Sequence, residues 1–349
     1  MMKSNRRPPA TVVFYDSKTG RGGGQAVLES LLMRMSDDDD VRLVMPSQGL
    51  TAVSIPPHVR TYTKFVELEN DTIPGSDMLL ICNTNAGMPA LLRFARTLRA
   101  KSNSVRTFAI VHNYPMTLAK SAATRHFLKQ FDDAVVVEPG LLSLHGDAHS
   151  PGWLSLDEPL TRSVDYIDRP IRRTGRVKSY GRPDPEKGLD LLPKIYSALT
   201  ARGYTCEVAL GGSLGSNRRY ADQLRSSLAP WLVDGQRNSD WIDPGDVFVI
   251  ASRAEAACLL AQEVLSRGAF GVVSRVGLMP YLSPDGTSMR GFAPGKTASA
   301  ISAALDALTM PEEQFSAECL AGVALIEHRA GLWHDNVVNL IRQRRQVSA

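Results

Sequence analysis

Short apolar runs rich in β-branched residues alternate with longer helix-like segments along most of the chain. Most of these runs are continuous rather than alternating, as expected for strands that are buried on both faces of a parallel sheet. The alternation therefore predicts an α/β fold of the doubly wound type. Strands are expected at Thr11–Tyr15, Val41–Met45, Met78–Cys82, Thr107–Val111, Ala134–Val137, Val177–Tyr180, Cys206–Leu210, Val247–Ile250 and Gly271–Ser274. Helices are expected at Gly24–Met35, Pro89–Ala100, Met116–Gln130, Lys187–Ala201, Ala256–Arg267 and Ala298–Leu308.

The chain of 349 residues is too long for one ordinary hydrophobic core, so two domains are expected. The alternation stops between Pro139 and Gly175, where apolar runs are few. A boundary near Asp168–Thr174 fits this break. We predict one Rossmann-like domain at residues 1–170, a second at residues 171–330, and a C-terminal segment at 331–349 with a helix over Trp333–Arg344.

Composition excludes several classes of protein. A content of 43% hydrophobic and 22% charged residues is typical of a globular chain and excludes wholesale disorder. No apolar stretch is long enough to span a membrane, and no secretory leader is expected. The cysteines Cys82, Cys206, Cys258 and Cys319 lie far apart without a CxxC pair, which disfavours a zinc site and fits a reducing cytoplasm.

The first candidate site is the run from Gly20 to Gly24, directly after the strand Thr11–Tyr15 and before a helix. Glycines allow a backbone to approach a phosphate, and a helix N-terminus offers oriented N–H groups. The spacing is neither the dinucleotide fingerprint nor a P-loop. A flexible turn between strand and helix is the equal alternative.

A second candidate follows the strand Val177–Tyr180. Arg182 comes directly after this strand, and Glu186-Lys187-Gly188 is expected to open the next helix. Two cations beside a helix start can bind a diphosphate, and an arginine can do so with two parallel hydrogen bonds. The alternative is that both cations are solvated loop residues.

The third candidate follows the strand Val247–Ile250, where Glu255 and Glu263 are separated by seven residues. Glu255 is expected at the junction of strand and helix, with Glu263 inside the helix. Carboxylates there can accept hydrogen bonds from pairs of sugar hydroxyls. Alternatively, Glu255 is an acid favoured by the helix dipole and Glu263 is a surface residue.

His112 is the fourth candidate, at the end of the apolar strand Thr107–Val111. Doubly wound sheets keep their ligand sites at the carboxyl ends of their strands. A single histidine is more often structural, so both roles stay open. The chain contains no GxSxG turn, and nothing supports a serine hydrolase.

Taken in order, these segments resemble the retaining GT-B glycosyltransferases, and among them the GT4-like family called glycosyl transferases group 1. That family has a glycine-rich N-terminal loop, a G-R…E-K-G segment and an E-x7-E motif. This chain has Gly22-Gly23-Gly24, then Gly181-Arg182 followed by Glu186-Lys187-Gly188, then Glu255 and Glu263. The resemblance covers about residues 10–345, and its second half is the more specific part.

The resemblance implies a role for each matching residue. Arg182 and Lys187 would bind the donor diphosphate and stabilise it as a leaving group. Glu263 would bind the donor ribose, Glu255 would hold the sugar hydroxyls, and His112 would line the reaction centre from the first domain. The implied donor-binding set also contains Gly22, Gly23, Gly24, Gly211, Gly212, Ala256, Ala257, Cys258 and Leu259. The implied catalytic set is His112, Arg182, Lys187 and Glu255.

The same resemblance implies two Rossmann-like domains facing a cleft, with the C-terminal helix crossing back to the first domain. The expected reaction is sugar transfer from a nucleoside-diphosphate sugar to an acceptor hydroxyl with retention of configuration. Negative charge that develops on the departing diphosphate would be neutralised by Arg182 and Lys187, so no metal is expected. UDP- or GDP-linked sugars are favoured as co-substrates, and no other cofactor is expected.

The chain departs from the family pattern after the first glutamate of E-x7-E. The family often has an aromatic residue and a glycine there, whereas this chain has Ala257 and Cys258. The departure leaves the donor sugar open. The segment between Leu210 and Val247 is short, which leaves the base open too.

Two alternatives belong to other functional classes. One is a GT-B-like sugar-nucleotide epimerase or hydrolase, and the other is a catalytically silent protein that binds a sugar nucleotide. The acceptor is open between a glycan, a lipid-linked glycan, a natural product, a protein and a modified nucleic acid. A cytoplasmic location is expected, and peripheral contact with the inner face of a membrane is left open by the basic residues Arg6, Arg7, Arg342, Arg344 and Arg345.

Overall fold

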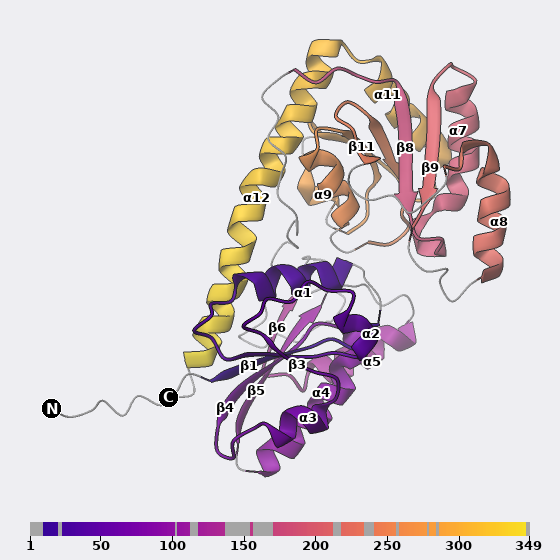
Figure 1. Ribbon diagram of the computed structural model, residues 1–349. Coiled ribbons are helices and arrows are strands. Elements are labelled where there is room, and N and C mark those ends of the chain that lie inside the picture. The colour runs from indigo at the N-terminus through magenta and orange to yellow at the C-terminus, as the bar shows by residue number, and fades with distance from the viewer. Residues whose placement is uncertain are drawn as a thin grey trace. The chain divides into compact units, whose positions relative to one another are not determined.

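The computed structural model describes residues 10–19, 23–101, 103–111, 118–136, 154–155, 170–211, 218–233, 241–255, 258–277, 279–283 and 286–346. The chain divides into two compact units, Met1–Thr161 together with Gly331–Ala349, and Arg162–Ala330. Each unit contains a parallel β-sheet with helices on both of its faces (Figure 1). The expected α/β class is confirmed.

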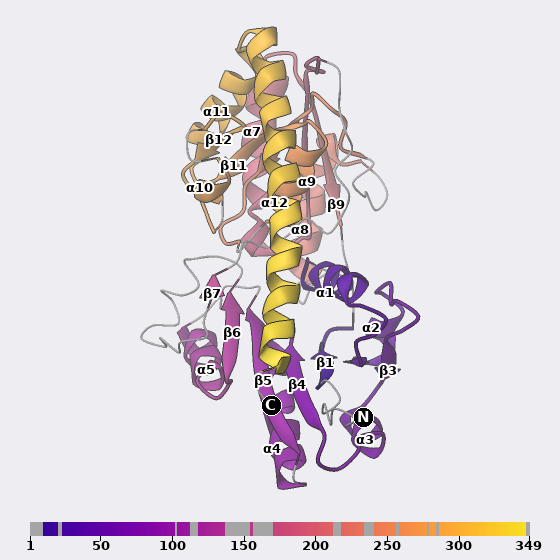
Figure 2. The ribbon, with the colours of Figure 1, turned by 90° about the vertical axis from the view of Figure 1, so that its left-hand side faces the viewer.

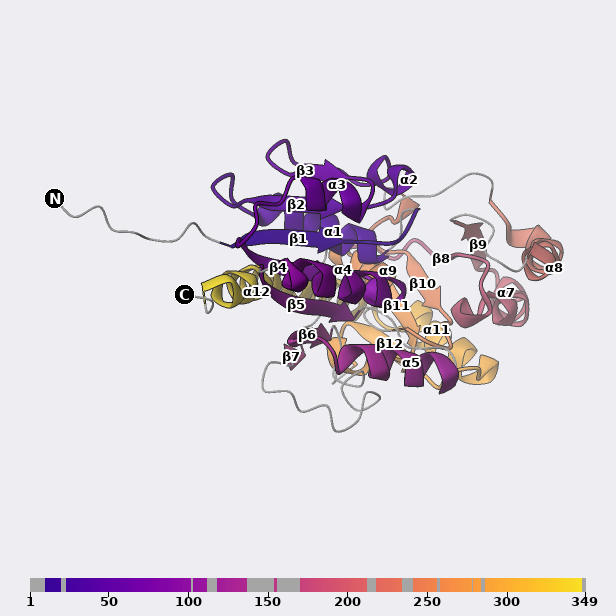
Figure 3. The same cartoon turned by 90° about the horizontal axis from the view of Figure 1, so that it is seen from below.

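The first sheet has seven strands in the described residues, in the order β3-β2-β1-β4-β5-β6-β7, and Figure 3 shows this order from one edge to the other. All of its pairings are parallel, and Val12 of β1 lies opposite both Val41 and Leu79. The strand order reverses between β1 and β4, so the loops that follow these strands meet at the carboxyl edge. The strands are β1 (Thr11–Tyr15), β2 (Val41–Val44), β3 (Arg60–Tyr62), β4 (Asp77–Cys82), β5 (Ser104–Val111), β6 (Asp133–Val136) and β7 (Leu154–Ser155).

Helices cover both faces of the first sheet, with α1 on one side and α4 on the other (Figure 1). Val12, Val13 and Phe14 are fully buried because β1 lies in the middle of the sheet. This burial explains why its sequence is continuously apolar. The helices are α1 (Gly23–Arg34), α2 (Ser47–Leu50), α3 (Phe65–Asn70), α4 (Met88–Ala100) and α5 (Leu118–Leu128), with a 3₁₀ turn at Asn85–Gly87.

The second sheet has five strands in the described residues, in the order β12-β11-β10-β8-β9, and they too are all parallel. Its order reverses between β8 and β10, so the loops after these two strands meet at the carboxyl edge. The strands are β8 (Arg176–Gly181), β9 (Thr205–Leu210), β10 (Val247–Ile250), β11 (Phe270–Ser274) and β12 (Met289–Phe292).

Helices α7 and α11 pack against each other on one face of the second sheet, and α9 covers β11 from the other (Figure 1). The core between them contains fully buried Tyr196, Val247 and Phe270. The helices are α7 (Leu192–Thr200), α8 (Arg218–Leu228), α9 (Leu259–Ser266), α10 (Met279–Leu282) and α11 (Thr297–Thr309). Short 3₁₀ turns occupy Pro185–Lys187, Leu189–Leu191 and Ala229–Trp231.

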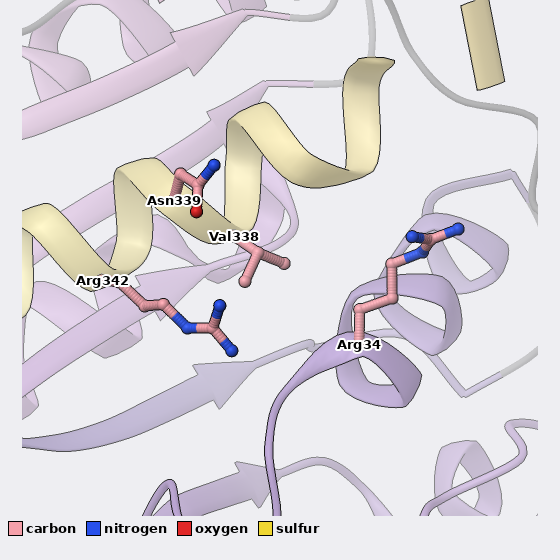
Figure 4. Close-up of a pocket in the computed structure, with 4 residues that line it drawn as sticks. All are labelled: Arg34, Val338, Asn339 and Arg342. Carbon is pink, nitrogen blue, oxygen red and sulfur yellow. The ribbon is translucent and has the colours of Figure 1, made fainter. Parts of the chain in front are cut away.

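Helix α12 (Glu312–Gln346) is one continuous helix (Figure 2). It is far longer than the predicted segment Trp333–Arg344. Within the first unit, Arg344 pairs with Asp133 of β6 at 3.2 Å. A cavity of about 150 Å³ lies between α1 and α12, lined by Arg34, Val338, Asn339 and Arg342 (Figure 4). Because α1 ends at Arg34, this cavity is on the side of the amino ends of the strands.

Two predicted helix starts are wrong, and both for the same reason. The helix expected from Lys187 begins at Leu192, after the 3₁₀ turns Pro185–Lys187 and Leu189–Leu191, and Gly188 between these turns has φ 62°, so a right-handed helix cannot run through it. The helix expected from Ala256 begins at Leu259, after Cys258 with φ 45°. A left-handed residue stops a right-handed helix from extending across it. In the described part of the chain, no helix combines the length and the apolar character needed to cross a membrane.

Candidate functional site

Two loops meet where the strand order of the second sheet reverses. The loop after β8 carries Arg182 and Lys187, and the loop after β10 carries Ser252 and Glu255. Lys187 is the last residue of the 3₁₀ turn Pro185–Lys187, which places its side chain on this edge. The topology therefore brings together two segments that are far apart in the sequence.

Lys187 and Glu255 form an ion pair at this edge. The Lys187 Nζ donates to Glu255 Oε1 at 2.5 Å, and the Ser252 hydroxyl donates to the same oxygen at 2.8 Å. The two charged side chains are only 23% and 13% exposed. The structure thus joins two residues that the sequence predicted as separate candidates.

The ion pair sets the protonation of Lys187. Burial by itself lowers the pKa of this amine, but the Glu255 carboxylate more than offsets that, and the pKa is raised above its ordinary value. Lys187 therefore stays cationic at neutral pH. A positive charge held at the carboxyl edge by one carboxylate can also be shared with an anionic ligand.

Arg182 lies directly after β8 and is more exposed. Its side chain is 53% exposed and pairs with Asp184 and Glu186, both at 3.2 Å. These two partners are local, whereas Lys187 reaches across to the β10 loop. Arg182 is thus at the expected edge, with its guanidinium accessible to solvent.

The remaining predicted residues of the second unit fall into three groups. Cys258 and Leu259 lie at the start of α9, and Cys258 is buried with φ 45°. Glu263 lies in the second turn of α9, and its side chain is half-buried. Gly211 follows β9, and a Cβ there would overlap the ring and hydroxyl of Tyr180, so a larger residue would displace that side chain. Gly212, Ala256 and Ala257 lie outside the described residues.

In the first unit, Gly23 and Gly24 are the first two residues of α1, close after β1. Asn83, which follows β4, donates to the carbonyl of Gly24 at 2.9 Å and to the buried carboxylate of Asp16 at 2.8 Å. These contacts fix the start of α1 at the carboxyl edge of the sheet. Gly22 and His112 lie outside the described residues.

Sequence reasoning missed Asp16, Asp190 and Arg253. Arg253 forms a doubly hydrogen-bonded ion pair with Asp190 at 2.6 and 2.7 Å, next to Lys187 and Glu255. One signal was available for Asp16, which is an acidic residue directly after a wholly apolar strand and before the glycines. No comparable signal exists for the pair Asp190–Arg253, because its members are 63 residues apart.

Comparisons with known proteins identify the fold of this chain. No protein-family model matches the chain, and no curated protein sequence does. Among solved structures, HepE from Anabaena in complex with UDP and glucose has a TM-score of 0.78 at 12% identity, covering 95% of this chain and 99% of HepE. The fold is GT-B.

Two further GT-B structures extend the likeness to other enzymes. A UDP-forming α,α-trehalose-phosphate synthase from Burkholderia vietnamiensis has a TM-score of 0.70 at 12% identity, covering 98% of this chain and 99% of its own. Sucrose-phosphate synthase from Thermosynechococcus elongatus has a TM-score of 0.68 at 14% identity, covering 97% and 99%. At such identities the likeness is one of fold.

Proposed function

We propose that this chain is a glycosyltransferase that moves a sugar from a nucleoside-diphosphate sugar to an acceptor hydroxyl. The observation that carries the proposal is the meeting of Lys187 and Glu255, 2.5 Å apart, at the point where the second sheet reverses its strand order. Ligands of open α/β sheets bind at such points. A cation beside a carboxylate suits a ligand with both phosphate and hydroxyl groups.

The neighbours in fold support a uridine nucleotide as the donor. HepE has been solved with UDP-glucose, and the trehalose-phosphate synthase is described as UDP-forming. We therefore propose a UDP-linked sugar as the first donor to test.

In the proposed mechanism, Lys187 and Arg182 stabilise the diphosphate as negative charge develops on it during departure. Lys187 is already cationic and held at the edge, so little reorganisation accompanies its interaction with phosphate oxygens. The exposed Arg182 can turn from Asp184 and Glu186 towards the same group. Two such cations supply the charge that a metal ion supplies in other transferases, so we propose a metal-independent reaction.

Glu255 and Glu263 are proposed to bind the donor through hydroxyl groups. Glu255 has one oxygen on Lys187 and Ser252, and its carboxylate would accept hydrogen bonds from the sugar. Glu263, one turn into α9, would accept them from the ribose. Retention of configuration is proposed from the family resemblance: the acceptor hydroxyl attacks the anomeric carbon on the face from which the diphosphate departs, the bond to the diphosphate breaks, and the hydroxyl proton passes to the diphosphate.

The test is the thermal stability of the protein with UDP, GDP, ADP and CDP and their sugar conjugates, with and without Mg²⁺. A ligand that binds only the folded protein stabilises it, by about 2.7 kcal/mol at one hundred times its Kd. We expect UDP to raise the Tm of the wild type without Mg²⁺ and to leave the double variant Arg182→Ala/Lys187→Ala unchanged.

The control is the double variant Lys194→Ala/Arg202→Ala. It removes two exposed cations, one in α7 and one directly after this helix. It should retain the full UDP response. An equal response in the variant lacking Arg182 and Lys187 would contradict the site. A response that depends on Mg²⁺ would contradict metal independence while leaving the nucleotide site in place.

A further inference from the structure

Arg253 joins the two loops that carry Lys187 and Glu255, through its guanidinium and its backbone N–H. The backbone N–H of Arg253 donates to the carbonyl of Glu186 at 2.7 Å, and its Nη1 donates to the carbonyl of Pro185 at 2.7 Å. Both of its Nη atoms donate to the Asp190 carboxylate, at 2.7 and 2.6 Å. Arg253 therefore contacts the β8 loop through three different residues.

These three contacts lie on both sides of Lys187 in the sequence. Pro185 and Glu186 directly precede Lys187, and Asp190 follows it by three positions. Arg253 itself stands two positions before Glu255, the partner of the Lys187 amine. Arg253 thus contacts the loop that carries Lys187 and belongs to the loop that carries Glu255.

Asp190 is itself fixed from a third element. The Tyr220 hydroxyl of α8 donates to Asp190 Oδ1 at 2.9 Å. The hydrogen bond from Arg253 is the first cause that lowers the pKa of the Asp190 carboxyl, so this residue is ionised at neutral pH. A bidentate pair has a fixed plane, which an ion pair between a lysine and a carboxylate lacks.

The Arg253–Asp190 pair is partly exposed to solvent. Arg253 and Asp190 are each 39% exposed, and ion pairs at such positions are screened by solvent. Their geometry is nevertheless closely specified, with four hydrogen bonds made by one side chain and its own N–H. Hydrogen bonds that fix the geometry this closely are what a group needs in order to orient a site.

We propose that Arg253, held by Asp190, is a positioning residue that aligns Lys187 with Glu255 for binding the diphosphate of the donor. The identity of that ligand rests on the proposed function. The alignment itself concerns only the ligand-free protein, so it can be measured without any nucleotide.

The first experiment measures the reactivity of the Lys187 amine in the ligand-free protein. Trace acetylation with acetic anhydride, read by mass spectrometry, compares Lys187 with Lys194 and Lys296 in the same molecule. In Arg253→Ala we expect acetylation of Lys187 to rise about tenfold, because the amine leaves Glu255. Lys194 and Lys296 should keep their wild-type rates, which excludes a general loosening of the fold.

Conservative variants keep the test independent of folding. Arg253→Lys retains the charge but not the two-pronged geometry, and should behave like Arg253→Ala at Lys187. Tyr220→Phe removes one hydrogen bond to Asp190, and should give an intermediate rise of about twofold to threefold. The matched control is Arg225→Lys, since Arg225 pairs with Asp222 on the surface of α8 at 3.7 Å. It should leave Lys187 unchanged.

The second experiment measures UDP affinity in the same variants. We expect Arg253→Lys to weaken UDP binding about tenfold, with a ligand-free Tm within about 2 °C of the wild type. Unchanged Lys187 reactivity in both Arg253 variants would overturn the positioning role. A wild type that binds no nucleoside diphosphate would overturn the proposed function instead, and the acetylation result would still decide the positioning role.

Discussion

The two sheets reverse their strand order in the same way, but the chain places different chemistry at the two reversal points. The first point lies beyond β1 and β4, and the second point lies beyond β8 and β10. Beyond β1 and β4, the buried Asp16 carboxylate accepts hydrogen bonds from neutral donors in the described residues, which are the N–H of Lys18 and the amides of Gln25 and Asn83. Beyond β8 and β10, the side chains form ion pairs, Lys187 with Glu255 and Arg253 with Asp190.

The difference indicates what each point can do. Neutral donors around a fully buried carboxylate hold a backbone in place, and here they hold the start of α1. Partly exposed ion pairs can exchange a carboxylate for an anionic ligand. We infer that the first point shapes a backbone surface, whereas the second point supplies charge to a ligand.

The largest effect is expected from Gly188→Ala at the second point. Gly188 has φ 62°, and a Cβ there would overlap the carbonyl oxygen of Ala251. Both strain and overlap oppose the substitution, and we expect a loss of about 3 kcal/mol in the free energy of unfolding. Urea denaturation measures it.

Gly203→Ala is the matched control, because Gly203 also has a positive φ, 88°, but open space around its missing Cβ. It should cost about 1 kcal/mol, the cost of the left-handed conformation alone. Equal losses at Gly188 and Gly203 would mean that the close approach between the two loops is unimportant for stability.

Next in size is Asp16→Asn, which tests the first point. The substitution replaces an accepting oxygen with a donating amide among donors, and we expect a loss of about 2 kcal/mol in the free energy of unfolding. Asp222→Asn, on the exposed surface of α8, is the control and should lie within about 0.5 kcal/mol of the wild type.

The same variant sharpens the comparison between the two points. If they are independent, acetylation of Lys187 in Asp16→Asn should match the wild type. A rise as large as the one expected for Arg253→Ala would show that the first point also acts on the ion pairs of the second unit.

The central strands could be predicted from the sequence because burial on both faces makes them continuously apolar. The edge strands β3, β7 and β12 were not predicted, because they are short and contain no continuous apolar run, whereas the longer edge strand β9 was. The predicted helix Trp333–Arg344 is much shorter than α12, which also contains Gly322. A Cβ at Gly322 would lie 3.0 Å from Leu265, so this glycine permits close packing rather than ending the helix.

The candidate site was predictable only in part, and for a physical reason. The ends of β8 and β10 were recognisable as strand ends, and the family resemblance implied that Lys187 and Glu255 belong to one donor site. Which side chains pair with each other depends on loop geometry set by Gly188 and Cys258, whose positive φ values are not readable from spacing. The role of Arg253 depends on that same geometry.

The smallest effect is a pH dependence at the first point. Burial raises the pKa of the Cys82 thiol, at the end of β4, to about 12 from an ordinary value of 9.0. Above pH 9 the thiol loses its proton in the unfolded chain but keeps it in the folded protein. The contribution of Cys82 to the free energy of unfolding is therefore complete below pH 9 and falls progressively up to pH 12. At pH 10 the expected loss in the free energy of unfolding is about 1.4 kcal/mol.

The measurement is urea denaturation of the wild type and of Cys82→Ala, each at pH 8 and at pH 10. The variant should lose less stability than the wild type between pH 8 and pH 10. An identical loss of unfolding free energy in both proteins would mean that the Cys82 thiol also ionises in the folded state. Water would then reach this thiol at the first point.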